Sequence, residues 1–255
     1  MLWRFEFIVV RQVFAGSEVG VMAMVSGMVV RSVVLAGLMV GAVGWGQAAK
    51  TAYPAMAPAE QYMMERGAEI ALAKSAAPPE IAKDAEVMVM GRHGYEVAVK
   101  GTNGFVCLVE RGWTAGKDDP DFWNPKLRGP LCLNAVSARS YLPRTIKKTE
   151  WVLAGASKEQ MYAKLKVALD KGELKPIETG AMCYMLSKDG NLGDGNGHWH
   201  PHLMFFVSST EPKAWGANLS GSPILAAEMP EDRLTIFFVP VAKWSDGTVD
   251  EGHSH

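Results

Sequence analysis

Three histidines at alternate positions are the residues in this chain best placed to do chemistry. They are His198, His200 and His202, in the segment GHWHPHLMFF. Residues two apart in a strand point to the same face about 6.6 Å along the chain, so two neighbouring imidazoles can lean onto one metal ion. Zinc accepts imidazole nitrogen at about 2.0–2.1 Å. The spacing therefore predicts a divalent, zinc-like metal site at His198 and His200.

His202 joins this site only if the backbone turns before it. In a straight strand His198 and His202 stand about 13 Å apart. Pro201 lies between the second and third histidines, where it can bend the chain. Asp189 and Asp194, in the preceding loop, are the candidate carboxylate ligands.

Other interpretations of these residues stay open. One is a small-ligand site without metal, with Trp199 beside the histidines and Trp123, from the aromatic loop 113–130, as further contacts. Another is that the histidines are hydrogen-bonded polar residues at a sheet end and that the aromatic residues only hold the loop on the core. If a metal activates water at an open position, the protein is a metal-dependent hydrolase with Asp194 or Glu228 as base.

The order of strand and helix patterns along the chain predicts an α+β fold. Runs of β-rich sequence are typical of strands, and Asn103-Gly104 between two of them indicates a hairpin. Strands, then helices, then strands again favour one domain with a mainly antiparallel sheet of five to six strands flanked by helices. The expected strands are 85–91, 95–100, 105–112, 180–187, 202–209 and 233–241, and the expected helices are 59–74, 143–155 and 157–172.

The register of one predicted hairpin decides which residues can reach the histidines. If strand 180–187 pairs with the strand that begins at His202, Ser187 faces His202. Cys183 then lies opposite Phe206, too far along the ladder to reach His200.

The N-terminus predicts export. Arg31, the apolar run Val33–Trp45 and the small residues Gly46 and Ala48 have the pattern of a secretory signal cut after Ala48. This signal would begin at Met28 and leaves residues 1–27 as an extension. The alternative is a membrane anchor, but an arginine at the centre of a span costs about 2.5–3.5 kcal/mol.

The predicted domain layout follows from this cleavage. Residues 1–48 are the signal with its extension, 49–57 a linker, 58–245 the globular domain and 246–255 a disordered tail. Cleavage removes three arginines and two glutamates and leaves a formal charge of −2. We therefore expect no nucleic-acid partner, no stable membrane insertion after cleavage, and an unknown small molecule as partner.

Three cysteines in an exported chain indicate one disulfide and one spare thiol. They are Cys107, Cys132 and Cys183, and spacing alone leaves all three pairings open. We favour Cys107 with Cys132, because the Pro-rich segment between them has few other restraints. Three buried, unpaired thiols are the alternative.

Several segments resemble a recurrent, uncharacterised set of exported bacterial proteins. The similarity is carried by GTNGFVCLV, GPLC, CYMLS and PHLMFF, over roughly residues 85–240. The resemblance implies export and a single domain, and it implies no activity. The functions to distinguish are an exported binding protein, a metal-dependent hydrolase and a structural envelope protein without a site.

Overall fold

The computed structural model describes residues 53–193 and 199–253, which lie in the second of two compact units, 47–255. The predicted signal, residues 1–48, lies outside the described residues. The fold is α+β with one sheet, as predicted, but the sheet has eight strands rather than five or six. Among the described residues, no helix is both long and apolar enough to cross a membrane.

The strand order in the sheet is β2-β1-β3-β4-β5-β6-β8-β7, and only β1 and β3 pair in parallel. The strands are β1 (Glu86–Gly91), β2 (Gly94–Val99), β3 (Val106–Glu110), β4 (Gly129–Leu133), β5 (Met182–Met185), β6 (His202–Ser208), β7 (Leu225–Met229) and β8 (Leu234–Pro240). The α-helices are α1 (Arg66–Lys74), α2 (Pro79–Ala82), α3 (Ala135–Ser140), α4 (Leu142–Leu153) and α5 (Lys158–Asp170).

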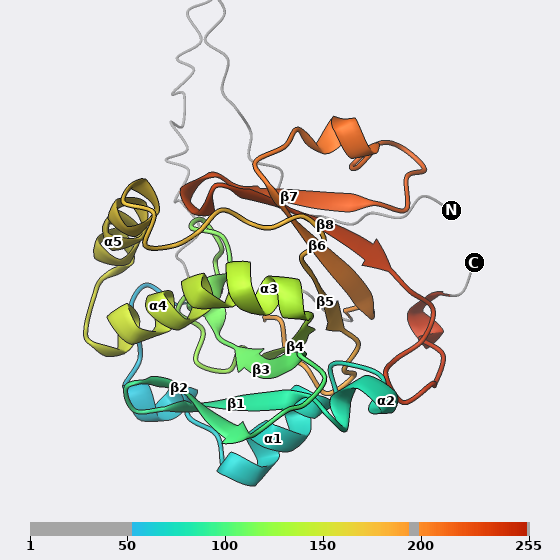
Figure 1. Cartoon of the computed structure of the whole chain (residues 1–255), viewed down its shortest axis with the longest axis horizontal. Helices are drawn as coiled ribbons and strands as arrows, with labels where there is room; N and C mark the ends of the chain where they lie inside the picture. Colours follow the sequence, from blue (N-terminus) through green and yellow to red (C-terminus); the bar gives the residue numbers. More distant parts are fainter. Residues whose placement is uncertain (1–52, 194–198, 254–255) are drawn as a thin grey trace, which may run out of the picture. The chain divides into compact units, whose positions relative to one another are not determined.

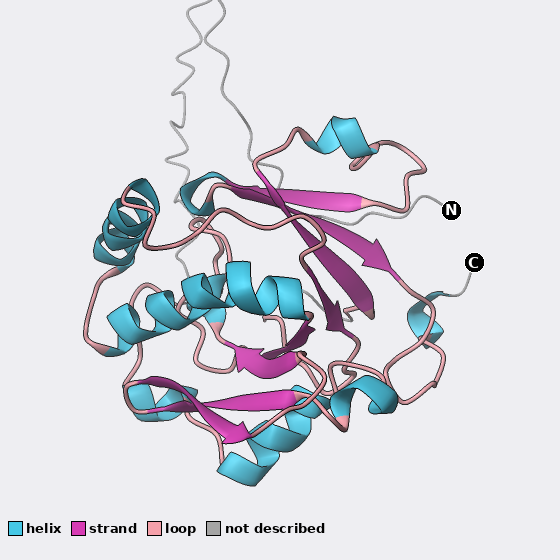
Figure 2. Ribbon diagram, in the orientation of Figure 1, coloured by secondary structure: helices cyan, strands magenta, loops and turns pink. Residues whose placement is uncertain are grey.

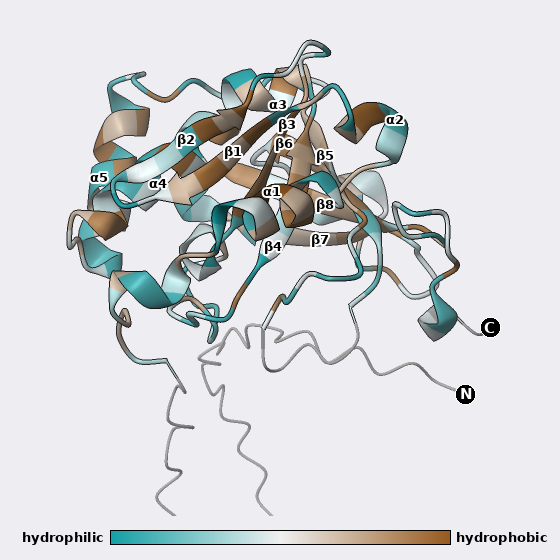
Figure 3. Ribbon diagram, turned by 90° about the horizontal axis from the view of Figure 1, so that it is seen from below, coloured by the Kyte–Doolittle hydropathy of each residue, from teal (hydrophilic) through white to brown (hydrophobic). Residues whose placement is uncertain are grey.

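Helices cover the two faces of this sheet (Figures 1 and 2). Helix α1 contacts β1, β3 and β4 on one face, and α3 and α4 lie on the other. In β3, Leu108 packs toward α3 and α4, and its neighbours Cys107 and Val109 pack toward α1. The central strands therefore carry apolar residues on both sides, which gives them their mostly brown colour in Figure 3.

The predicted hairpin at Asn103-Gly104 is wrong. Strand β3 pairs with β1, so β2 stays at the sheet edge. All five residues of β3 are buried, whereas β2 exposes Glu96 and Val97. A strand buried on both faces belongs in the interior of the sheet, and this burial outweighs the local turn signal. The hairpin that the structure has lies one strand earlier, where the turn at Arg92-His93 joins β1 to β2.

Two strands were missed because their sequences are unlike strands. Strand β4 contains Pro130, which argues against a central strand. Strand β7 is LAAEM, and alanine and glutamate are depleted in strands. Both are strands because of the neighbours with which they pair.

Two of the three predicted helices are confirmed. Helix α4 matches 143–155 closely, and α5 lies within 157–172 and begins with a capping box formed by Ser157 and Gln160. The predicted helix 59–74 is interrupted. A 3-10 turn at Ala59–Tyr62 precedes α1, and the Glu65 side chain caps α1 by accepting from two backbone N–H groups.

The predicted disulfide is confirmed. Cys107 and Cys132 are bonded directly opposite each other in β3 and β4, and both are fully buried. Cys183 is a buried free thiol, and burial raises its pKa well above the usual value. The structure therefore has the single bridge and spare thiol that the odd count indicated.

Replacing both Cys107 and Cys132 with alanine should lower the free energy of unfolding by about 3 kcal/mol. Without the cross-link, the unfolded chain has more conformational entropy. Urea titration of wild type and double variant, each without reductant, measures this. An unchanged midpoint would show that the bridge adds no stability to the sheet.

Candidate functional site

His200 is held by a buried carboxylate. It lies just before β6, and its Nδ1 is 2.5 Å from Oδ2 of Asp250. The Asp250 side chain is 0% exposed and that of His200 is 17% exposed. Because Nδ1 faces Asp250, Nε2 is the nitrogen with which this ring can bind a metal or move a proton.

His202 has a separate partner. Its Nδ1 donates to the main-chain oxygen of His200 at 2.8 Å. Its ring lies edge-on to Trp199 and to Phe238, at 5.7 Å from each. The pKa of His202 is lowered, mainly because the ring is buried, so the ring favours its neutral form. The Nδ1 atoms of the two histidines therefore point to different partners.

The remaining predicted ligands are not brought together by the part of the chain that the structure describes. His198 and Asp194 lie outside it. Within residues 53–193 and 199–253, no group of three His, Cys, Asp or Glu side chains could hold a metal ion. Asp189 is exposed in the loop after β5. The metal site of His198, His200 and His202 stays a prediction.

Trp199 fills the space beside the two histidines. Its ring packs edge-on against Trp244, at 5.4 Å. Gly190 is required here, because a Cβ at that position would lie 2.9 Å from the Trp199 ring and 3.1 Å from Pro130. The buried Trp199 Nε1 has no hydrogen-bond partner among the residues described. The structure thus places Trp199 next to His202, and the ligand contact expected of Trp199 stays a prediction.

The C-terminal segment supplies Asp250. Residues 246–253, predicted as part of a disordered tail, form a turn and a 3-10 helix. Asp250 N donates to Ala242 O, and Ser245 N donates to Leu186 O. These bonds tie the segment to the end of β5 and bring the carboxylate to His200. No local signal in the sequence marks Asp250 for this role.

The predicted register between the strands of Cys183 and His202 is wrong by two residues. Met185, not Ser187, lies opposite His202, and Cys183 lies opposite Met204. Ser187 lies beyond the end of β5, and its hydroxyl is hydrogen-bonded to that of Ser75 at 2.6 Å. Cys183 stays on a different part of the ladder from His200, as expected.

Glu228, predicted as a possible base, lies away from His202. Glu228 in β7 pairs with Thr235 in β8, and Thr235 pairs with Val207 in β6. Val207 is five residues along β6 from His202. A hydrolytic base for the histidine site would therefore have to be a different residue.

Trp123 is 6% exposed and packs edge-on against Phe122, with ring centroids 4.6 Å apart. Its main-chain oxygen accepts a hydrogen bond from the hydroxyl of Tyr62. These contacts hold the loop on the core, and the ligand contact expected of Trp123 stays a prediction.

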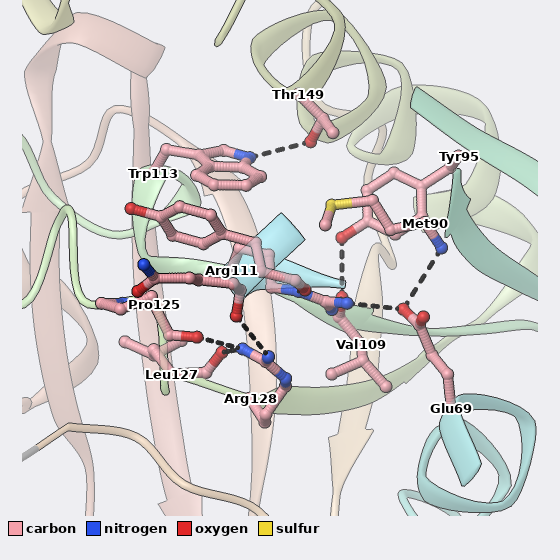
Figure 4. A network of polar contacts seen from close by, with 12 residues as sticks. Glu69, Met90, Tyr95, Val109, Arg111, Trp113, Pro125, Leu127, Arg128 and Thr149 are labelled. Carbon is pink, nitrogen blue, oxygen red and sulfur yellow. Dashed lines mark hydrogen bonds and ion pairs between the residues drawn. The ribbon is translucent and has the colours of Figure 1, made fainter. Parts of the chain in front are cut away.

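Sequence reasoning missed a buried ion pair on the side of α1 (Figure 4). Arg111 Nη2 donates to Glu69 Oε1 at 2.9 Å, and both side chains are at most 1% exposed. Arg111 also donates to the main-chain oxygens of Tyr62 and Val109, and Glu69 accepts from Met90 N. The pair joins α1, β1 and β3, and its partners within the protein give it a structural role.

A second missed cluster surrounds the buried carboxyl of Glu110. It accepts hydrogen bonds from the hydroxyls of Thr145 at 2.8 Å, Thr114 at 3.1 Å and Tyr141 at 3.3 Å. Burial raises the pKa of Glu110, and the three hydroxyls and nearby Lys148 oppose that shift. The carboxyl therefore favours its neutral form more than an exposed glutamate does.

Glu110→Gln should remove a pH dependence of stability. A raised pKa in the folded state gives stability that is complete below the unfolded pKa and is lost as pH rises through the folded pKa. The free energy of unfolding of the variant, relative to that of wild type, should therefore rise as the pH rises above about 4.3, the ordinary pKa of a glutamate. Urea titrations across this range test it. Glu173→Gln, at an exposed site, is the matched control for the loss of one carboxylate charge, and an equal pH dependence in the two variants would contradict the assignment to Glu110.

Comparison with known proteins adds no functional assignment to this geometry. Neither a family model, nor a curated protein, nor a solved structure matches the chain. The candidate site is therefore defined by its own residues, His200 and Asp250, with His202 and Trp199 beside them.

Proposed function

We propose that this is an exported binding protein whose ligand, a divalent transition metal such as zinc, is held by His200. The observation that carries the proposal is the contact between His200 Nδ1 and the buried carboxylate of Asp250. A histidine that ligates metal commonly gives its other ring nitrogen to a carboxylate, which fixes the ring and raises its basicity. Asp250 is thus a positioning residue for the Nε2 atom of His200.

Export is part of this proposal. Its support is the signal pattern before Ala48 and the Cys107–Cys132 disulfide, which is compatible with an oxidising compartment. Mass spectrometry of the protein from producing cells should give a chain that begins at Ala49. A membrane-bound chain that still begins upstream of Arg31 would contradict export.

Zinc binding by the mature chain tests the metal proposal. We expect one zinc per chain in wild type by elemental analysis, and strongly reduced affinity in His200→Ala. Asp250→Asn should weaken binding about 10- to 100-fold, because the ring loses its orienting partner. His93→Ala is the matched control, since His93 is exposed in the β1–β2 turn.

The outcomes separate the candidate functions. Stoichiometric zinc in wild type that is lost in a folded His200→Ala variant supports the proposal. No zinc in wild type, or equal zinc in His200→Ala, contradicts it and favours the small-ligand site or the structural envelope protein. Circular dichroism of each variant checks that its fold is intact.

A metal-dependent hydrolase is the second candidate, and the same His200–Asp250 contact favours it. A metal held by His200 would lower the pKa of a bound water at an open position. Hydrolysis of ester substrates that disappears in His200→Ala and on zinc removal would support this function. Bound zinc without turnover would leave binding as the function.

A further inference from the structure

Helix α4 turns a row of polar residues toward the sheet. Arg144, Thr145, Lys148 and Thr149 are each at most 2% exposed. Thr145 donates to Glu110, Lys148 to Asp232, and Thr149 to the main-chain oxygen of Thr145. Each of these three side chains therefore has an acceptor within the protein.

Arg144 is the exception in this row. Its Nη2 donates to Lys175 O at 2.8 Å, which is one bond for five N–H groups. Its Nε and Nη1 are buried and have no hydrogen-bond partner among the described residues. Buried polar atoms are rarely left without a partner, so these two nitrogens indicate a group that the protein chain does not supply.

The charges around Arg144 are also unbalanced. Lys148 Nζ contacts both oxygens of Asp232, at 2.6 and 2.7 Å, and both side chains are at most 4% exposed. The field of Asp232 acts on Arg144 as well, so one carboxylate serves two buried cations. Nearby Arg233 is already paired with Asp170. A guanidinium stays protonated in a protein, and an uncompensated buried charge is costly.

We propose that a small inorganic anion of the size of chloride binds Arg144 where α4 meets the segment after α5 and the short 3-10 helix Pro230–Asp232. An anion accepts from a guanidinium N–H and also compensates its charge, whereas a water molecule does only the first. Burial raises the pKa of Glu110, which favours its neutral form. Glu110 is therefore a weaker second source of negative charge in this region than an exposed glutamate would be. This site is independent of His200 and of the metal proposal.

Bromide is the probe for a direct test. Crystals of the wild-type protein grown in sodium bromide should show an anomalous peak in hydrogen-bonding contact with Arg144 Nη1 or Nε. Water density at these atoms, with no anomalous peak, would overturn the proposal. This measurement does not depend on the folding of any variant.

Thermal unfolding gives an independent test in solution. The Tm of wild type should rise with chloride concentration when sodium gluconate keeps the ionic strength constant, since a ligand that binds only the folded state stabilises it. Arg144→Met should lose this chloride dependence. Arg139→Met is the matched control, because Arg139 is exposed on α3 and pairs with Glu178. An equal chloride response in wild type and Arg144→Met would overturn the proposal.

Discussion

Arg111→Met is expected to lower the free energy of unfolding by about 3–5 kcal/mol, which is the usual cost of removing one partner of a buried ion pair. In wild type the Glu69 carboxylate is 1% exposed and also accepts from the N–H of Met90, and the variant leaves it without the guanidinium. It also leaves the main-chain oxygens of Tyr62 and Val109 without the guanidinium. Urea titration measures the loss.

The matched control for Arg111 is Arg66, on α1. Arg66 pairs with Glu96, but the two side chains are 51% and 60% exposed. Solvent screens such a pair, so Arg66→Met should cost less than about 1 kcal/mol. Equal losses for Arg66→Met and Arg111→Met would show that burial does not set the strength of these pairs.

Asp232→Asn is the second substitution with a large expected effect. It removes the carboxylate that Lys148 contacts and whose field acts on Arg144, so two buried cations lose their counter-charge. We expect a loss of about 3–5 kcal/mol in the free energy of unfolding. Urea titration at neutral pH measures it.

Lys148→Met should be milder than Asp232→Asn. It leaves Asp232 with the charge of Arg144 nearby, and a methionine fills most of the lysine volume. The double variant Lys148→Met/Asp232→Asn should lose less free energy of unfolding than the sum of the two single variants, because neither partner of this ion pair is left without the other. A larger loss for Lys148→Met than for Asp232→Asn would contradict this account of the charges around Arg144.

Local patterns in the sequence were sufficient for several elements. Helix α5 could be predicted because Ser157 and Gln160 cap it through bonds three residues apart. Six strands could be predicted because their residues favour β structure and are apolar in continuous or alternating runs. Strand β4 could not, since Pro130 is locally unsuited to a strand that its neighbours nevertheless complete.

The candidate site could be predicted only in part. The sequence marks His200, because three histidines lie at alternate positions. It cannot mark Asp250, which is 50 residues away and lies in a polar C-terminal stretch. The composition of this C-terminal stretch is typical of a solvent-exposed segment, and it does not show which of the carboxylates in the stretch is buried.

The buried charges were the least predictable feature. Arg144 and Lys148 lie in a helix whose charged residues suggest a solvated face, yet both are 2% exposed. Their burial depends on Asp232, which is 84 residues from Lys148 and lies in a different element. Electrostatic partners at such separations are set by the packing of elements.

The secondary structure of the longer elements and the α+β class follow from the sequence alone, because capping, apolar periodicity and β propensity act over a few residues. The favoured Cys107–Cys132 pairing was one of three that spacing left open, and it forms because β3 pairs with β4. Three features are set by the packing of distant segments: the position of β3 beside β1, the contact of Asp250 with His200 and the burial of Arg144. These features depend on which surfaces are buried against each other. The free energy of that burial comes from residues that are distant in the sequence and that only the complete fold brings together.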